Sequence, residues 1–307
     1  MNFESLIKTA QACGCTVATN VPMAQMTTFR VGGPADLLVT VPDAAALTAI
    51  VACCRRENIP WFWLGNGSNL LVGDRGIRGA VLHFDSRAAR VSLVDDTTVY
   101  CNAGMTLQRL CLFARDNSLT GLEFAYGIPG TVGGAVYMNA GAYGGEMAQV
   151  VERIDGVTAD GTPVTLNADE LALGYRHSAL MDRADDERVI VTGVYFKLNR
   201  GEQGAIAARM KELIGKRQEK QPLEFPSAGS FFKRPQGHFA GALVEQAGLK
   251  GYRVGDAQVS EKHAGFVVNR GNATAKDLCQ LCEDVQAAVW KSAKVRLEPE
   301  VRFVGEF

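Results

Sequence analysis

A glycine-rich stretch, residues 127–145, constrains the fold of this chain more than any other segment. It holds seven glycines and no charged side chain, yet Pro129, Asn139 and two tyrosines set it apart from low-complexity sequence. Glycine at this density allows positive φ and lets a ligand approach the main chain. Successive main-chain N–H groups in such a loop form a concavity that suits anionic oxygens. The stretch therefore predicts a binding loop for a long polar cofactor with a pyrophosphate.

A second glycine-rich turn follows a predicted β-α-β unit. An apolar strand over residues 37–41 leads into a helix over 44–58, and a short strand over 61–64 runs into the sequence Gly-Asn-Gly-Ser-Asn. A glycine turn at a strand end is a common place for phosphates. It is neither a GxGxxG fingerprint nor a P-loop. The alternative for both loops is a set of tight turns between strands.

Composition bounds the class of protein. At 307 residues we expect two or three domains, and 47% apolar with 21% charged residues is typical of an ordinary globular protein. The formal net charge of −1 argues against a general nucleic-acid binder. Residues 1–8 lack a secretory signal, and no apolar run approaches the ~20 residues needed to cross a bilayer. We therefore expect a cytoplasmic protein with no membrane partner.

The eight cysteines predict reduced thiols rather than a metal site. Cys279 and Cys282 form a CxxC, but at helical spacing on an apolar stripe, and no second CxxC or histidine pair follows at zinc spacing. Core thiols fit a reducing compartment. A redox pair is the alternative.

The remaining elements divide the chain near residues 201–204. Before this point we expect short strands over 80–83, 91–93 and 98–102, a helix over 107–118, a hairpin over 150–157 and 162–166, and a strand over 189–198. After it come a long helix over 205–220 and a smaller α/β unit, with helices over 239–247 and 274–291 and strands over 264–269 and 295–304. In the last strand, alternation places Glu298, Glu300 and Arg302 on one face and Val301 and Phe303 on the other.

Six segments, in order along the chain, resemble one family. They are TTFRVGGPA at 27–35, LGNGSNLLV at 64–72, the glycine-rich stretch, YRHS at 175–178, SAGSFFKRP at 227–235 and LEPEVRF at 297–303. Together they resemble the UDP-N-acetylenolpyruvoylglucosamine reductases (UDP-N-acetylmuramate dehydrogenases), flavoenzymes of peptidoglycan precursor synthesis. The resemblance runs from about Met26 to Glu306, and the chain looks like the shorter type II form.

The resemblance implies an α+β fold with three domains. Residues 1–78 and 79–203 would be the two subdomains of an FAD-binding region of the vanillyl-alcohol-oxidase (PCMH) type, and residues 204–307 a smaller α/β substrate-binding domain. It further implies FAD and NADPH as cofactors and UDP-N-acetylglucosamine enolpyruvate as substrate. The sequence leaves subunit number open, since no coiled coil or large apolar face is legible, and we expect a monomer.

The family motifs imply three sets of site residues. The catalytic residues would be Arg176, Ser230 and Glu300. The cofactor-binding residues would be Leu64, Gly65, Asn66, Gly67, Ser68, Asn69, Gly127, Ile128, Pro129, Gly130, Thr131, Val132, Gly133, Gly134, Asn139, Gly141 and Ala142. The substrate-binding residues would be Tyr143, Lys220, Lys233, Lys262, Arg270 and Arg302. Some relatives carry Asn where Arg234 stands, so its role does not transfer, and we expect His177 to be structural.

The implied chemistry is hydride transfer from reduced FAD to the enolpyruvyl ether. Arginine is a permanent cation, so Arg176 would stabilise the developing charge. Ser230 would protonate the substrate carbon. Glu300 would either polarise the carboxylate, if its own carboxyl group is protonated or hydrogen-bonded, or support Ser230. Without the resemblance, each of these three residues also fits a solvated surface position or a turn.

Two other functions stay open. The first keeps the fold but is an FAD oxidase that passes electrons to oxygen, recognised by fast reoxidation in air. The second is a nucleotide-sugar or flavin-binding protein without turnover, which would bind ligand but consume no NADPH. The presence of Arg176, Ser230 and Glu300 together argues against the second.

Overall fold

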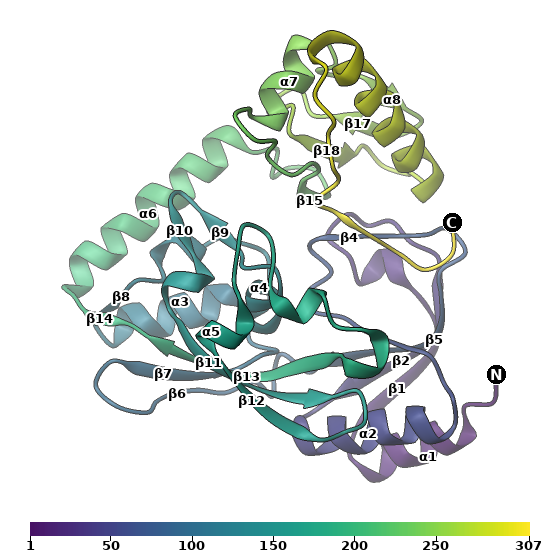
Figure 1. Cartoon of the computed structure of the whole chain (residues 1–307), viewed down its shortest axis with the longest axis vertical. Coiled ribbons are helices and arrows are strands. Elements are labelled where there is room, and N and C mark those ends of the chain that lie inside the picture. The colour runs from purple at the N-terminus through teal and green to yellow at the C-terminus, as the bar shows by residue number, and fades with distance from the viewer. The chain divides into compact units, whose positions relative to one another are not determined.

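The computed structural model describes all 307 residues, which group into two units, each built from segments far apart in the sequence (Figure 1). Unit 1 contains Met1–Thr19, Leu37–Gly65 and Gly79–Lys216. Unit 2 contains Asn20–Asp36, Asn66–Arg78 and Arg217–Phe307. The division into domains 1–78, 79–203 and 204–307 stays a prediction.

Two helices and a four-stranded sheet open the chain. The sheet has the order β1 (Thr16–Pro22), β2 (Pro34–Val41), β5 (Ile77–Phe84) and β3 (Trp61–Trp63). Helices α1 (Glu4–Ala12) and α2 (Ala44–Arg56) contribute Leu6, Leu47 and Ile50 to a buried core in unit 1. Helix α2 begins at Asp43, whose carboxylate accepts the N–H of Ala46 at 2.9 Å. The predicted helix over 44–58 is thus confirmed, although it ends two residues early.

A five-stranded antiparallel sheet forms the largest part of unit 1. Its order is β12 (Pro163–Asn167), β11 (Val151–Thr158), β13 (Val189–Lys197), β7 (Thr98–Asn102) and β6 (Val91–Leu93). The predicted hairpin and the strand over 189–198 are confirmed. Smaller elements surround the sheet: α3 (Leu107–Asp116), α5 (Ala168–Leu171), β8 (Leu119–Thr120), β14 (Asn199–Arg200), β9 (Gly141–Ala142) and β10 (Gly145–Glu146). The helix predicted over 107–118 is α3, which ends at Asp116.

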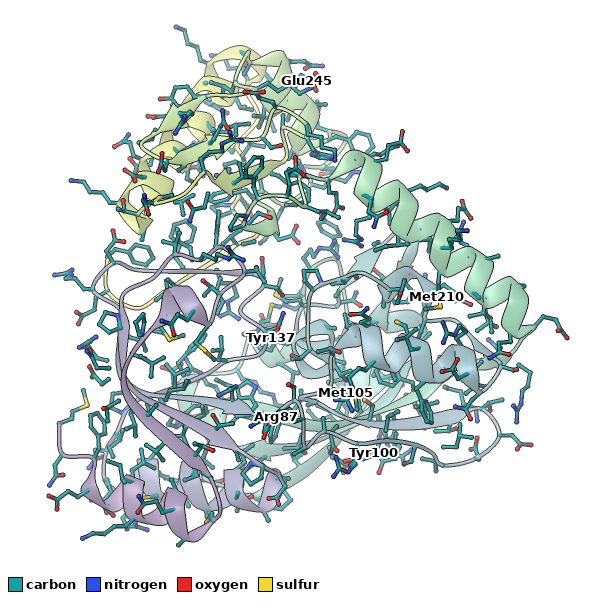
Figure 2. The ribbon with its side chains drawn as sticks, turned by 180° about the vertical axis from the view of Figure 1, so that it is seen from behind. Arg87, Tyr100, Met105, Tyr137, Met210 and Glu245 are labelled. Carbon is teal, nitrogen blue, oxygen red and sulfur yellow. The ribbon has the colours of Figure 1, made fainter.

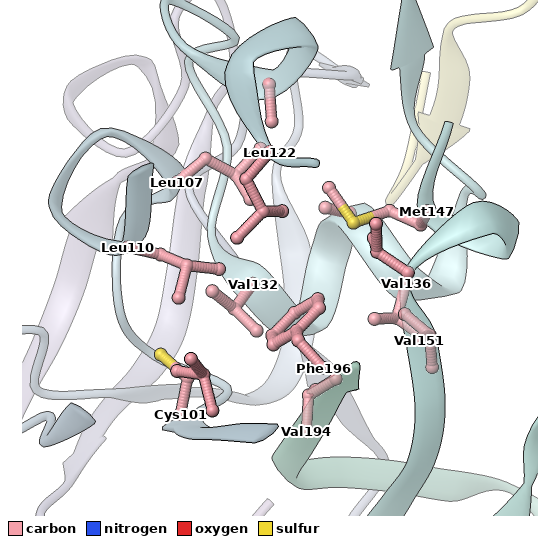
Figure 3. Close-up of a cluster of buried hydrophobic side chains, with 14 of the residues drawn as sticks. Cys101, Leu107, Leu110, Leu122, Val132, Val136, Met147, Val151, Val194 and Phe196 are labelled. Carbon is pink, nitrogen blue, oxygen red and sulfur yellow. The ribbon is translucent and has the colours of Figure 1, made fainter. Parts of the chain in front are cut away.

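The glycine-rich stretch contains a helix that the sequence did not predict. Helix α4 (Val132–Tyr137) begins after Thr131, whose hydroxyl accepts the N–H of Gly134 at 3.4 Å. Figure 3 shows Val132 and Val136 among the side chains around Phe196. Glycine disfavours helix by about 1 kcal/mol per residue. Burial of the two valines offsets that cost, because each fully buried aliphatic side chain stabilises by about 1.5–3 kcal/mol.

Unit 2 holds a further four-stranded sheet and two helices. The sheet order is β15 (Ser227–Ser230), β18 (Phe266–Asn269), β17 (Ala257–Val259) and β16 (Arg253–Val254). Helices α7 (Ala240–Gln246), which carries Glu245, and α8 (Ala275–Ala293) lie beside it (Figures 1 and 2). Asp74 fixes the start of α8, because its carboxylate accepts the N–H groups of Ala275 and Lys276 at 2.8 and 3.0 Å. Helix α6 (Gln203–Lys220) precedes this sheet in the chain.

The last predicted strand is wrong over most of its length. Only β19 (Arg302–Val304) is a strand, and it pairs in parallel with β4 (Leu70–Val72). Residues 295–301 form no strand, and their one bridge joins Pro299 to Phe232. Proline has no N–H to donate to a ladder, which explains the interruption. The expected burial alternation fails as well, since Val301 is 2% exposed but Phe303 is 39% exposed.

The strand predicted over 264–269 begins at Phe266, and the long helix predicted over 205–220 begins at Gln203. The helices predicted over 239–247 and 274–291 are α7 and α8.

All eight cysteines are free thiols. Among the helices, none has both the length and the apolar character needed to span a membrane.

Candidate active site

The two glycine loops meet in unit 1. A Cβ placed on Gly65 would lie 2.8 Å from Oγ1 of Thr131, so only glycine allows this approach. Leu64 is anchored by its N–H, which donates to the carbonyl of Leu82 at 2.8 Å. Gly65 belongs to unit 1, whereas the rest of the predicted loop, 66–69, belongs to unit 2. The two loops therefore approach each other at Gly65 and Thr131.

The protein itself uses several of the main-chain N–H groups in the loop over 127–134. Those of Val132 and Gly133 donate to the carbonyls of Met105 and Ala103 at 2.8 and 2.9 Å. Figure 2 labels Met105, whose carbonyl accepts the Val132 N–H. Further internal bonds hold the N–H groups of Ile128, Gly130 and Gly134. Pro129 and Gly134 are exposed, so part of the loop is accessible from solvent, although proline has no N–H and that of Gly134 is already bonded to Thr131.

A tight hairpin follows α4. Strands β9 and β10 pair through Ala142 with Gly145, and the two residues between them, Tyr143 and Gly144, have φ of 55° and 86°. Two successive positive φ angles define a type I′ turn. A tyrosine in this conformation is rare, and residues held this way concentrate at functional sites. Tyr143 is 39% exposed at the hairpin tip.

Asn139 lies between α4 and this hairpin with no exposed surface. Its Nδ2 donates to the carbonyl of Gly174 at 2.8 Å, and its Oδ1 accepts the N–H of Ala148 at 2.9 Å. The side chain thus joins the start of the predicted catalytic turn to the segment after the hairpin. It points into the protein.

Arg176 occupies a turn closed by Gly174 and His177, whose main chains exchange hydrogen bonds of 3.0 and 3.1 Å. Its φ is 53°. The guanidinium donates to the main-chain carbonyls of Gly141 and Asn139, at 3.0 and 3.5 Å. The same group lies 5.4 Å from the ring centre of Tyr175. A half-buried cation is therefore fixed beside the hairpin that carries Tyr143.

Ser230 lies at the end of β15 in unit 2. The pairing of β15 with β18 shifts between Ser227 and Ser230, where Gly229 has φ of 79°. This β-bulge turns the end of the strand. Ser230 is exposed, while Phe231 and Phe232 are 1% and 4% exposed. The two buried rings anchor the strand and leave the hydroxyl at the surface.

Glu300 lies alongside the Ser230 segment. The N–H of Glu300 donates to the carbonyl of Phe231 at 2.8 Å, and the N–H of Lys233 donates to the carbonyl of Glu298 at 2.8 Å. On the other side, Nδ2 of Asn69 donates to the carbonyl of Glu300 at 3.1 Å. Unit 2 therefore brings together three predicted site segments that are far apart in sequence.

The five cationic substrate-binding candidates all lie exposed in unit 2, whereas Tyr143 belongs to unit 1. Lys262 Nζ donates to the carbonyl of Gln218 at 2.8 Å, and Lys233 lies 3.4 Å from the carboxylate of Glu298. The guanidinium of Arg270 lies 4.0 Å from the ring centre of Phe225. Lys220 and Arg302 are also exposed. Arg176 belongs to unit 1, so the structure groups only Ser230 and Glu300 of the three catalytic candidates.

The sequence missed how residues 28 and 29 support Ser230. Oγ1 of Thr28 donates to the carbonyl of Ser227 at 2.7 Å, and its N–H donates to the carbonyl of Gly67 at 3.2 Å. Phe29 packs edge-on against Phe231, with ring centres 6.4 Å apart. Both residues lie in the motif over 27–35, but the sequence alone did not indicate that they support the Ser230 segment.

Residues 35–167 match a family described as an FAD binding domain, and this range includes both glycine loops. The class of the protein follows: it is an FAD-dependent oxidoreductase, as predicted.

The family follows from the rest of the chain. Residues 221–304 match the C-terminal domain of UDP-N-acetylenolpyruvoylglucosamine reductase. The reductase of that name from Agathobacter rectalis is 48% identical over 297 residues, covering 93% of each chain. Its counterpart from Clostridium botulinum (strain Hall) is 46% identical over 306 residues, covering 100% of this chain and 96% of the relative. The crystal structure of the Thermus caldophilus enzyme superposes with a TM-score of 0.78 at 37% identity, covering 94% of this chain and 98% of that one.

The chain belongs to the family of UDP-N-acetylenolpyruvoylglucosamine reductases. The predicted α+β fold class, with an FAD-binding region followed by a smaller domain, is confirmed. The family uses FAD and NADPH and acts on a UDP-sugar in peptidoglycan precursor synthesis.

Proposed function

We propose that this chain reduces the enolpyruvyl ether of UDP-N-acetylglucosamine to UDP-N-acetylmuramate, with NADPH as the reductant. Near-complete coverage of the reductases by this chain supports the substrate class. The observation that carries the proposal is the convergence of Asn69, Ser230 and Glu300 in unit 2. A residue of the proposed flavin loop, a serine and a glutamate on adjoining main-chain segments are residue types that a reaction site needs, which supports an enzyme rather than a binding protein.

When bound, FAD supplies the hydride chemistry, and the chain supplies orientation, charge and the proton. Ser230 is the proposed proton donor to the substrate carbon. Its exposed hydroxyl sits on a strand end fixed by two buried rings. Serine is a weak acid, so this role requires strong carbanion or enolate character at the carbon that it protonates.

Arg176 is the proposed stabiliser of charge that builds on the substrate carboxylate. Its guanidinium cannot lose its proton, and two main-chain carbonyls fix its direction. Preorganised charge of this kind is worth most where it meets charge that develops in the transition state. Glu300 is the proposed second stabiliser, a role that requires its carboxyl group to be protonated, because an ionised carboxylate would repel the developing negative charge. Main-chain bonds on both sides hold its position.

The binding assignments follow the same pattern. We assign the loops over 64–69 and 127–134, with Gly141 and Ala142, to FAD. We assign Tyr143, Lys220, Lys233, Lys262, Arg270 and Arg302 to the substrate, whose phosphates and carboxylate attract cations. We also propose that the chain works in the cytoplasm as a monomer. Light scattering of the flavin-loaded protein tests the monomeric state.

Product analysis tests the function. We expect NADPH consumption that depends on the enolpyruvyl sugar and yields a product heavier by two hydrogens, identified by mass spectrometry. Rapid flavin reoxidation in air without the sugar would instead indicate an oxidase. Tight binding without NADPH consumption would indicate a binding protein.

A further inference from the structure

We propose that Asn139 is a positioning residue for Arg176, not a cofactor ligand as the resemblance implied. This inference rests on the proposed role of Arg176 at the substrate. The side chain of Asn139 has no exposed surface, so it cannot reach a ligand without rearrangement. Its side-chain hydrogen bonds go to the turn that carries Arg176 and to the segment that follows the hairpin.

The carboxamide holds the main chain of the catalytic turn. Nδ2 donates to the carbonyl of Gly174, the residue that opens the turn and lies two positions before Arg176. Oδ1 accepts the N–H of Ala148, which ties the same side chain to the segment after the hairpin. A buried amide whose donor and acceptor are both used fixes two segments at once, because losing either bond leaves a buried polar group unsatisfied.

The main chain of Asn139 holds the other end of the arginine. Its carbonyl accepts from Nη1 of Arg176 at 3.5 Å, beside the carbonyl of Gly141, which accepts from Nη2 at 3.0 Å. Asn139 thus contacts both the backbone that carries Arg176 and the group that bears its charge. The two residues have φ of 41° and 53°, a conformation that persists only where the surroundings enforce it.

Removing the side chain frees the turn at Gly174 and lets the guanidinium move. A misplacement of about 1 Å costs on the order of 100-fold in rate for a group that acts by position. We therefore expect Asn139→Gly to slow reoxidation of reduced flavin by the enolpyruvyl sugar by about 10- to 100-fold. Flavin reduction by NADPH and the affinity for FAD should stay unchanged, because neither depends on Arg176.

Glycine is the variant of choice because it adopts positive φ without strain. Asn58→Gly is the matched control: Asn58 also has positive φ, 52°, and lies exposed in unit 1 after α2, so both half-reactions should be unaffected. The decisive measurement is a double-mutant cycle with Arg176→Ala, using stopped-flow reoxidation rates. If Asn139 acts through Arg176, Asn139→Gly adds little further loss in the Arg176→Ala background.

The outcomes separate the two claims. Additive losses in the cycle, or an unchanged reoxidation rate in Asn139→Gly, would overturn the positioning role. Weaker FAD binding with equal loss of both half-reactions would do the same and return Asn139 to the cofactor. If Arg176→Ala reoxidises normally, the proposed function of Arg176 fails instead. Should Asn139→Gly not fold, Asn139→Asp keeps the acceptor for Ala148 and removes the donor to Gly174, and the same cycle applies.

Discussion

The Arg176 turn of unit 1 and the Glu300 segment of unit 2 hold their charged residues in different ways. Arg176 is held largely by its side chain, whose guanidinium bonds to the carbonyls of Asn139 and Gly141. Glu300 is held by its main chain, between the carbonyl of Phe231 and the amide of Asn69. A substitution at Arg176 therefore removes charge and an anchor together. A substitution at Glu300 or Ser230 changes chemistry and leaves these main-chain bonds in place.

The largest effect should come from Ser230→Ala. Loss of a positioned proton donor costs about 10²- to 10⁴-fold in the step that it serves. We expect flavin reoxidation by the enolpyruvyl sugar to slow by that factor, while NADPH reduction and thermal stability stay near those of the parent protein. Stopped-flow measurement of both half-reactions decides the matter; an equal loss in both would contradict the donor role.

The next largest effect should come from Arg176→Ala, with reoxidation slowed about 10²- to 10³-fold, as for loss of one preorganised stabiliser. Arg176→Lys should recover little of this loss, because an ammonium cannot reproduce the planar fork that bonds to two carbonyls. Unlike Ser230→Ala, both variants should also loosen the turn at Gly174. Faster amide exchange at His177, which bonds to Gly174, would show this, and unchanged exchange would argue that the guanidinium is not an anchor.

Glycine substitutions extend the comparison to stability. In unit 2, Gly67 has φ of 60°, and an added Cβ would lie 2.1 Å from the carbonyl oxygen of Met26. Gly67→Ala should lower the free energy of unfolding by about 2 kcal/mol or more. In unit 1, Gly215 of α6 has open space around it, so Gly215→Ala should raise that free energy by about 1 kcal/mol. Chemical denaturation measures both, and equal effects would contradict the assigned loop geometry.

The smallest effect concerns alkaline pH. Burial raises the pKa of Cys54 in unit 1, and of Cys282 in unit 2, to about 12. These folded pKa values exceed those of the unfolded chain, so the associated stability is full below pH of about 9 and declines as pH rises toward about 12. We expect the free energy of unfolding to decrease as the pH rises from about 9 to about 12, and we expect this decrease to be smaller in Cys54→Ala. A pH-independent free energy in this range would contradict burial of these thiols.

Sequence predicted the elements whose signals are local. The strand predicted from the apolar run of β13 and the helix predicted from the 3.6-residue periodicity of α8 were both correct, because each element buries a continuous face. The sequence did not predict helix α4 because its two glycines disfavour a helix, and its stability depends on packing of its valines in the core around Phe196. The strand over 295–304 was predicted too long because only Arg302–Val304 pair with β4, whereas Pro299 forms a single bridge to Phe232. Both pairings are tertiary contacts that the local sequence does not encode.

The candidate active site shows the same difference between features that the local sequence predicts and features that depend on tertiary contacts. Motifs supplied the family and the identity of the candidate residues, since side-chain chemistry is written directly in the sequence. They did not supply the burial of Asn139 or the support of Ser230 by Thr28, because these depend on pairings between residues that lie far apart in the chain. Asn139 looked like a ligand in sequence because it follows the cofactor loop, and only its burial suggests otherwise.

The most direct measurement is an anaerobic absorption experiment on the flavin-loaded protein, with NADPH added first and UDP-N-acetylglucosamine enolpyruvate second. We expect the yellow colour to bleach with NADPH and to return only after the enolpyruvyl sugar is added. In Ser230→Ala the bleaching should remain and the return should slow by about 10²- to 10⁴-fold. A wild-type protein that bleaches but does not recover on addition of the sugar would contradict the proposed substrate.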